Sequence, residues 1–246
     1  MKNVVEIKNL SFSYEKNKAV LRELDLTIQE NSIVAILGKN GCGKSTLLDC
    51  IIGCNEYKKG EILIDDKNIK DLSSKELAKK VAYISQNTII NIDYTVLEFI
   101  LFGRNCHLAF GSSPNSKDYE IAKSNARKLG ISHLLSKDIN KLSGGERQLA
   151  FIARALTQES QIIIMDEPTA SLDYGNQLRL FEIIEELKNE GKTIIFTTHN
   201  PEHVKLLNCI VVVIEDGKIQ TSGIASEIIT EDLLVSVYGE IIKKYK

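Results

Sequence analysis

The chain has 246 residues, which favours one domain with a sizeable insertion, and its content of 43% hydrophobic and 26% charged residues excludes a disordered chain. Its net charge of −2 supplies no broad basic field, so we expect no nucleic-acid partner. No apolar run approaches the ~18 residues of a membrane span, the N-terminus shows no export signal, and five scattered cysteines argue against a disulfide scaffold.

Short apolar segments alternate with helical patterns along the chain. Ile33–Leu37 is apolar at every position, which is typical of a strand in a parallel sheet covered on both faces. Asp216-Gly217 between two apolar segments predicts a hairpin turn, and residues 180–187 carry one apolar helical face. The predicted strands are Val4–Asn9, Leu24–Ile28, Ile33–Leu37, Glu61–Ile64, Val81–Ser85, Gln161–Met165, Thr193–Thr197, Cys209–Glu215 and Lys218–Ser222.

A glycine-rich loop follows the strand Ile33–Leu37 and precedes a helical pattern. It reads Gly38-Lys39-Asn40-Gly41-Cys42-Gly43-Lys44-Ser45, with Thr46 next. The glycines let backbone N–H groups curl around phosphates, so we expect all nine residues to bind ATP. Lys44 is expected to contact the β- and γ-phosphates, and the Ser45 hydroxyl to ligate Mg²⁺. The alternative is a glycine-rich turn without a ligand, which the complete match disfavours.

The segment 95–142 lacks strand patterns and reads as helices around a loop at Gly111–Asn115. We interpret it as a helical subdomain inserted into an α/β core. A single domain of residues 1–246 would then consist of a nucleotide-binding core, 1–94 and 143–246, and this insertion.

A second glycine-bearing helix start reads Leu142-Ser143-Gly144-Gly145-Glu146. Ser143 and Glu146 have the S-x-x-E spacing of a capping box, which also occurs at Ser73–Glu76 and Thr95–Glu98 and therefore carries no functional information. The glycine pair does carry functional information. Each glycine weakens a helix start by up to ~1 kcal/mol relative to alanine, and the pair leaves N–H groups open to an anion.

Two acids, Asp166 and Glu167, follow the predicted strand Gln161–Met165. Acids at the end of a buried strand are costly unless they have partners. We expect Asp166 to hold Mg²⁺ through water and Glu167 to be the general base that polarises the attacking water. An exposed acidic turn would be the alternative without the phosphate loop.

The Leu142–Glu146 motif between the phosphate loop and the acidic strand end resembles the signature of ABC ATPases, and the resemblance covers essentially the whole chain. It implies the ABC ATPase fold, which is α/β: a P-loop NTPase core with a mainly parallel sheet, an antiparallel β subdomain and an inserted helical subdomain. It also implies an ATP hydrolase that uses Mg²⁺.

Four further residues match family elements in order. Tyr14 resembles the aromatic that stacks on adenine, and Gln86 resembles the Q-loop glutamine, which contacts Mg²⁺ and faces the permease. Asp173 resembles the D-loop aspartate, and His199 resembles the switch histidine on the γ-phosphate. Alone, each has an ordinary explanation: an isolated tyrosine is usually surface or core, and a histidine after a buried strand is usually packed or capping.

The resemblance implies three kinds of partner. In a head-to-tail dimer with a second copy, Ser143, Gly144, Gly145 and Glu146 would complete the partner's ATP site, and hydrolysis would reopen the dimer. The dimer would attach to integral membrane permease subunits at the cytoplasmic face of the membrane, as a peripheral protein. An extracytoplasmic substrate-binding protein would act indirectly.

Several segments are similar to ATPases that import iron–siderophore complexes, haem or cobalamin. They are Thr95–Glu98, Leu101–Arg104, His107-Leu108, Gly130–Leu134, Glu146–Gln148, Asp173–Gln177 and Thr198–Pro201. Residues from Ile89 to Arg104 should border the groove for the permease's coupling helix, so charge reversal at Arg104 should uncouple transport if that side chain faces the groove. Cys106 replaces a proline common in that subfamily.

Lys39 and Cys42 stand where other residues are commoner in the phosphate loop. The helix start and Lys44 predict a lowered pKa for the Cys42 thiol, and a maleimide block of ATPase activity from which MgATP protects. The alternative is an inert, half-buried thiol.

A soluble, non-transport ABC ATPase, such as one in iron–sulfur-cluster assembly, would share every nucleotide motif and stays open as the alternative function. DNA-repair and translation-factor ATPases are disfavoured, because the chain has neither a long coiled coil between the motifs nor a second ATPase domain.

Overall fold

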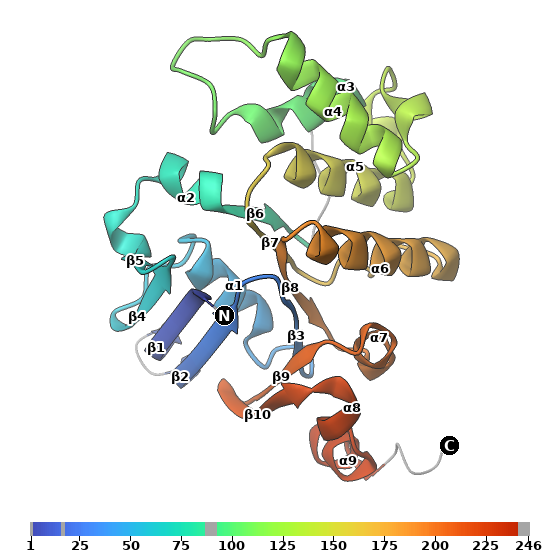
Figure 1. The fold of residues 1–246 in the computed structure, drawn as a ribbon. Helices are drawn as coiled ribbons and strands as arrows, with labels where there is room; N and C mark the ends of the chain where they lie inside the picture. The colour runs from blue at the N-terminus through green and yellow to red at the C-terminus, as the bar shows by residue number, and fades with distance from the viewer. Residues whose placement is uncertain (1, 16–17, 87–92, 241–246) are drawn as a thin grey trace. The chain divides into compact units, whose positions relative to one another are not determined.

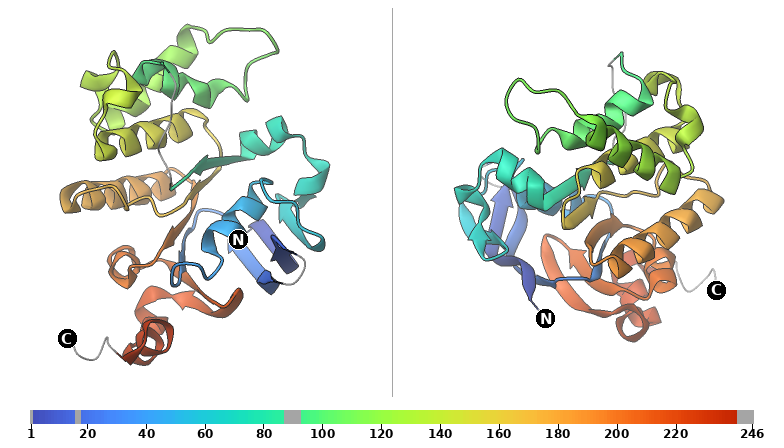
Figure 2. Two further views of the ribbon diagram at one scale, coloured as in Figure 1. Left: turned by 180° about the vertical axis from the view of Figure 1, so that it is seen from behind. Right: turned by 45° about the horizontal axis from the view of Figure 1, so that its top comes forward.

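A computed structural model describes residues 2–15, 18–86 and 93–240. Its contacts divide the chain into two compact units. The first unit combines the two ends of the chain, Met1–Leu72 and Ile183–Lys246, and the second is the segment between them, Ser73–Glu182. Figures 1 and 2 show the elements, which are described below within each unit.

The first unit contains an antiparallel sheet formed by neighbours in the sequence. Its strand order is β2 (Ala19–Gln29), β1 (Asn3–Ser13), β4 (Lys59–Ile64) and β5 (Lys67–Asn68). Alternate residues of β2 are buried, including Leu24, Leu26 and Ile28, so one face of this strand packs on the core. The sequence predicts shorter versions of β1 and β2, because the alternation is interrupted where Asn9 and Glu23 have positive φ angles of 50° and 49°.

The first unit also contains parallel strands. β3 (Ile33–Leu37) lies between β8 (Thr193–Thr198) and β9 (Ile210–Glu215) and is parallel to both. β10 (Lys218–Ile224) returns antiparallel to β9 through Asp216 and Gly217, whose φ angles of 48° and 76° confirm the predicted hairpin turn. The remaining helices of this unit are α1 (Lys44–Ile51), η1 (Ile69–Asp71), α7 (Pro201–Leu207), α8 (Ala225–Ile228) and α9 (Glu231–Tyr238).

The second unit is built around a long buried helix, α5 (Gly144–Thr157), and a parallel strand pair, β6 (Val81–Ile84) and β7 (Ile162–Met165). Its other elements are α2 (Ser74–Lys80), α3 (Val96–Leu101), η2 (Phe102–Arg104), α4 (Ser116–Lys128), η3 (Ser132–Leu134) and η4 (Ile139–Lys141). α6 (Tyr174–Asn189) continues from the second unit into the first. The α/β class with parallel and antiparallel sheet is therefore confirmed.

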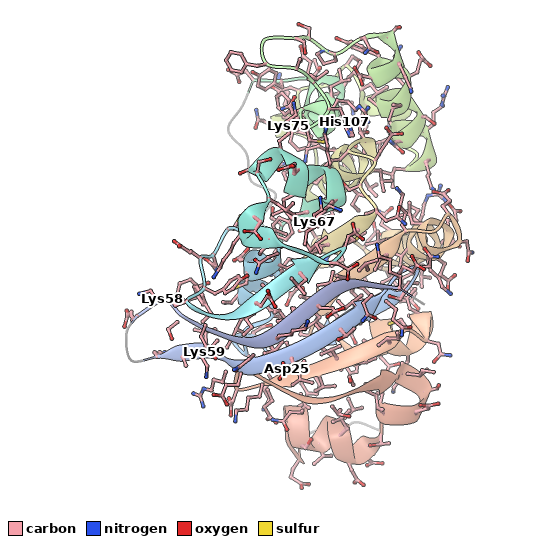
Figure 3. The ribbon with its side chains drawn as sticks, turned by 60° about the vertical axis from the view of Figure 1, so that its left-hand side comes forward. Asp25, Lys58, Lys59, Lys67, Lys75 and His107 are labelled. Atoms are coloured by element: carbon pink, nitrogen blue, oxygen red, sulfur yellow. The ribbon has the colours of Figure 1, made fainter. Side chains whose placement is uncertain are left out.

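The segment 95–142, all of which the structure describes, is helical as expected, and its one β contact is an isolated bridge between Thr95 and Asp138. The aromatic rings of Phe99 and Phe151 pack α3 on α5 with their centroids 4.8 Å apart. Two hydrogen bonds hold the segment between η2 and α4. The Nε2 atom of His107 lies 2.9 Å from the Gln158 carbonyl oxygen, and Lys75 donates to the Leu108 carbonyl (Figure 3 labels His107 and Lys75). The boundaries at 94/95 and 142/143 stay predictions about functional subdomains.

All three predicted capping boxes are present, at the starts of α2, α3 and α5. Asn115 and Asp118 form a further box at the start of α4. Among the described residues, no helix has the length and apolar character needed to cross a membrane.

Candidate functional site

The phosphate loop of the first unit requires its glycines for reasons of geometry. Gly41 and Gly43 have φ angles of 80° and 109°, in the left-handed region that side chains disfavour. At Gly38, a Cβ atom would lie 2.4 Å from the backbone oxygen of Ile214, so only glycine lets β9 approach. α1 then begins at Lys44, with Ser45 and Thr46 in its first turn. This is the strand–loop–helix context that the motif predicts.

The Lys44 ammonium group is folded back over this loop. Its Nζ donates to the carbonyl oxygens of Gly38, at 2.9 Å, and Lys39, at 3.0 Å, and the residue is 5% exposed. A buried ammonium group at the start of a helix attracts anions, because its charge adds to the open N–H groups of the helix.

The expected low pKa of Cys42 is wrong. Burial raises the pKa of this half-buried thiol, and the nearby Lys44 charge, which lowers it, has the smaller effect. Its Sγ would lie 2.7 Å from a Cβ on Gly38, so the thiol packs inside the loop. The alternative of an inert thiol therefore agrees better with the structure.

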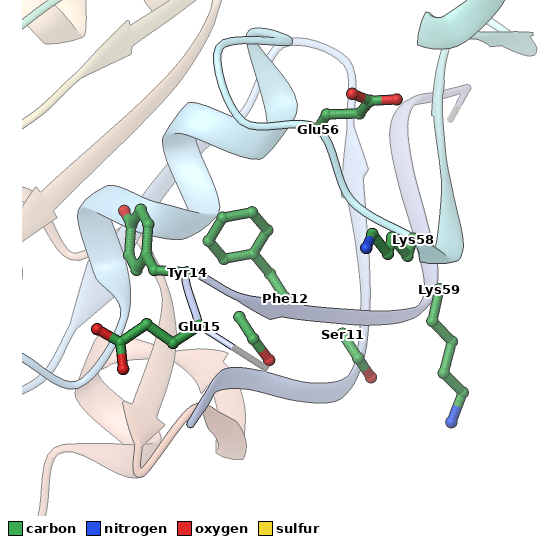
Figure 4. Close-up of a pocket in the computed structure, with 8 residues that line it drawn as sticks. Ser11, Phe12, Tyr14, Glu15, Glu56, Lys58 and Lys59 are labelled. Carbon is green, nitrogen blue, oxygen red and sulfur yellow. The ribbon is translucent and has the colours of Figure 1, made fainter. Parts of the chain in front are cut away.

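Tyr14 lies beside the phosphate-loop helix, where an adenine-stacking aromatic would be useful. Its ring is 64% exposed and packs edge-on against Phe12, with centroids 4.9 Å apart. Its hydroxyl oxygen lies 3.2 Å from Thr46 Oγ1. The ring borders a cavity of about 340 Å³ that Glu56 and Lys58 also line (Figure 4).

His199 follows β8 in the first unit, and its residue is exposed. The packed histidine lies four residues further on, at His203 of α7, which is 8% exposed. Burial, followed by the nearby His199, lowers the pKa of the His203 imidazole. The packed position that the sequence left open for His199 is therefore occupied by His203, and His199 itself is exposed.

In the second unit, Gln86 and two acids meet at the ends of the paired strands β6 and β7. The Gln86 Nε2 donates to Glu167 Oε2 at 3.3 Å. Asp166 is 4% exposed, and its N–H donates to the Ile84 carbonyl at 2.9 Å. Glu167 has φ 44°, a left-handed conformation that costs energy for a non-glycine residue and is typical of functional sites.

The donor atoms at these strand ends suit Mg²⁺, which prefers carboxylate and amide oxygens. Asp166 and Gln86 supply such oxygens in the second unit, and Ser45 supplies a hydroxyl in the first. In the part of the chain that the structure describes, no cluster of three or more His, Cys, Asp or Glu residues could hold a metal ion. A cation here would depend on further oxygens, such as those of a nucleotide.

The signature glycines differ from those of the phosphate loop. Ser143 caps α5, and a Cβ on Gly144 or Gly145 would meet Ser171 at an ordinary 3.7 Å. Packing within this unit therefore does not require glycine there. The Glu146 carboxylate accepts from the Ser143 N–H at 2.9 Å, and this bond is the main cause of its lowered pKa, so it acts as a helix cap.

The D-loop aspartate, Asp173, caps α6. Its Oδ1 accepts from the Asn176 N–H at 2.8 Å, and its Oδ2 accepts from Asn176 Nδ2 at 3.0 Å. A nucleotide contact by Asp173 stays a prediction.

Arg104 is buried, so the condition under which charge reversal was expected to uncouple transport, a side chain that faces the groove, is not met. The residue is 6% exposed, its Nε donates to Asp118 Oδ1 at 2.8 Å, and its Nη1 donates to Glu159 Oε2 at 2.6 Å. Arg104 thus joins η2 by ion pairs to Asp118 of α4 and to Glu159, two residues beyond the end of α5. The other end of the expected groove, Ile89, lies outside the described residues.

Two residues that the sequence analysis did not select hold the site's surroundings in place. Arg154 of α5 donates from Nη2 to the Tyr83 carbonyl at 2.9 Å, three residues before Gln86. Tyr238 of α9 donates to the His199 carbonyl at 2.9 Å. The sequence carries no signal for either contact, because partners this far apart are set by tertiary structure.

A profile of the ABC transporter family matches residues 21–170. The chain is 37% identical to a probable iron chelatin transport ATP-binding protein of Helicobacter pylori, over 88% of this chain and 85% of that protein. It is 34% identical to a molybdate import ATP-binding protein of Haemophilus influenzae, over 83% of this chain and 76% of that one.

Among solved structures, an inward-facing, putative metal-chelate type ABC transporter matches with a TM-score of 0.83 and 30% identity. The match covers 96% of this chain and 89% of the matched chain.

Proposed function

The chain belongs to the ABC transporter family as one of its ATP-hydrolysing members, and we propose that it energises the uptake of a metal chelate through a separate membrane permease. The substrate class would be an iron–siderophore complex, haem or a cobalamin-like molecule. The observation that carries this proposal is the similarity, over 88% of the chain, to a probable iron chelatin transport ATP-binding protein.

In the first unit, we assign nucleotide binding to the phosphate loop and Tyr14. The positive-φ glycines and the buried Lys44 ammonium group favour phosphate binding by Gly38–Thr46. The exposed Tyr14 ring favours stacking on adenine. His199 would contact the γ-phosphate.

In the second unit, we assign hydrolysis to the strand ends. Glu167 would polarise the attacking water, and the hydrogen bond from Gln86 would orient its carboxylate. Asp166 and Gln86 are the proposed Mg²⁺ ligands of this unit, and Ser45 is the proposed ligand of the first unit; when bound, Mg²⁺ neutralises charge on the phosphates.

The signature Ser143–Glu146 and Asp173 would act on the nucleotide of a second copy in a head-to-tail dimer. Support comes from the packing of Gly144 and Gly145. Because contacts within the chain do not require glycine at these positions, their open N–H groups suit a ligand from outside. The dimer would lie on the cytoplasmic face of the membrane against the permease, with a substrate-binding protein acting indirectly.

The relatives also offer a second substrate class, since one is a molybdate importer. A soluble iron–sulfur-cluster assembly ATPase stays the alternative outside transport.

The proposal is tested by purifying the tagged chain from detergent-solubilised native membranes, with Glu167→Gln as the hydrolysis-deficient control. We expect a polytopic permease to co-purify, and the reconstituted complex to take up a ferric siderophore, haem or cobalamin with ATP. Uptake of molybdate alone would overturn the chelate assignment, and a soluble scaffold without a permease would overturn the transport function.

A further inference from the structure

Hydrogen bonds between residues close in the sequence fix the segment that follows His199. Thr198 Oγ1 accepts from the Asn200 N–H at 3.0 Å and lies 3.2 Å from His203 Nδ1. Asn200 Nδ2 lies 3.2 Å from His203 Nε2, and Asn200 caps α7. These contacts join the end of β8 to the first turn of α7 and do not involve the His199 carbonyl group.

The His199 carbonyl is held from the other side by a distant residue. Tyr238, the last residue of α9, donates its hydroxyl to this oxygen at 2.9 Å, across 39 positions of sequence. α9 is itself well defined, because Thr230 Oγ1 accepts from the Leu233 N–H at 3.2 Å and Val237 is buried.

The chemistry of Tyr238 suits a permanent donor. Burial, followed by the nearby Cys42 thiol, raises the pKa of its phenol, so the hydroxyl keeps its proton throughout the physiological range. This hydrogen bond goes to the main-chain oxygen of His199 and does not involve its exposed imidazole.

We propose that Tyr238 is a positioning residue for ATP hydrolysis: its hydroxyl fixes the main chain at His199, so that the imidazole meets the γ-phosphate in one orientation. This inference rests on the proposed role of His199. A group held in place before the reaction needs less reorganisation during it, so the bond should affect turnover more than ATP binding.

The test compares two variants of the full-length protein that each remove one hydroxyl from α9. Tyr238→Phe should lower the kcat for ATP hydrolysis about five-fold, the value of one hydrogen bond, with the KM for ATP unchanged within about two-fold. Ser236→Ala is the matched control, because its hydroxyl donates within the helix to the Leu233 carbonyl at 2.8 Å. It should keep the wild-type kcat and Tm. The Tm of Tyr238→Phe should fall by no more than about 2–4 °C, the shift that the loss of one hydrogen bond causes in a chain of this size.

A double variant separates positioning from a merely structural role. If Tyr238 acts through His199, then Tyr238→Phe should cause no further loss of single-turnover rate in a His199→Ala background. An equal five-fold loss in that background, or a wild-type kcat for Tyr238→Phe, would overturn the inference and leave the proposed function intact. A wild-type kcat for His199→Ala would instead refute the role of His199 itself, and the inference with it.

Discussion

The phosphate loop and the signature helix each place glycines at a helix N-terminus, but under different constraints. In the phosphate loop, Gly43 needs its positive φ and Gly38 needs the missing Cβ, because β9 passes so close. At the signature, Gly144 and Gly145 are helical and have room for a side chain. The comparison indicates that the fold of its own unit requires the glycines of the first loop, whereas packing within the second unit does not require those of the signature, which agrees with their proposed role toward an outside ligand.

The largest expected effect on stability lies away from both glycine sites, in the second unit. Arg104→Ala would remove the charged partner of the buried Asp118 carboxylate and leave its hydrogen bond from the Asn115 N–H, so we expect the free energy of unfolding to fall by about 3–5 kcal/mol. Lys141→Ala is the control, because its pair with Asp138 is exposed and should contribute less than about 1 kcal/mol. Equal urea midpoints for the two variants would contradict the structural role of Arg104.

The next effect tests the packing of the phosphate loop. Gly38→Ala should lower the free energy of unfolding by about 1–3 kcal/mol and abolish ATP binding, because its Cβ would displace the backbone of β9. Gly41→Ala should cost less, since no atom lies within 4 Å of its Cβ and only the positive φ is unfavourable. Calorimetry with ATP measures both quantities, and a Gly38→Ala variant that binds ATP normally would break the comparison.

The signature should give the opposite result. Gly145→Ala should leave stability unchanged or raise it by up to about 1 kcal/mol, because alanine favours the helix. ATP binding to one copy should be unchanged, while ATPase activity of the dimer should fall by about ten-fold or more, since the partner's phosphate loses its close approach. Unchanged activity would show that the absence of a side chain at Gly145 is not needed for ATP hydrolysis.

The smallest effect concerns Cys42. Because burial raises its thiol pKa, less thiolate is present at pH 7 than for an ordinary cysteine, and maleimide labelling should be slower than for free glutathione. The labelling rate should rise as the pH is raised toward and beyond the usual cysteine range. Cys42→Ser should keep ATPase activity within about two-fold. Labelling faster than glutathione at pH 7 would restore the original expectation of a reactive thiol.

Local patterns predict local structure well in this chain. The phosphate loop, three of the capping boxes and the Asp216-Gly217 turn depend on residues within a few positions of one another, and the sequence predicts them. The helices α8 and α9 were not, because their short patterns are weak.

Side-chain environments were less predictable, because they depend on distant partners. Arg104 is buried by contacts with residues 14 and 55 positions away. Because these partners are distant, the local sequence showed only a charged residue after a helix, which favoured an exposed side chain. Cys42 has a neighbouring positive charge, as expected, but the burial that outweighs it comes from the folded loop. Tyr238 reaches His199 across 39 positions, a contact with no trace in either local sequence.

The arrangement of β3 also has a consequence for synthesis on the ribosome. The antiparallel sheet pairs strands close in sequence and is complete by Asn68, but β3 must wait for partners that begin at Thr193 and Ile210. At about 5–20 residues per second, this delay is on the order of 10–30 seconds. During that time Ile33–Leu37 is an apolar strand with two open edges, so nascent chains that stop before β8 should depend most on chaperones.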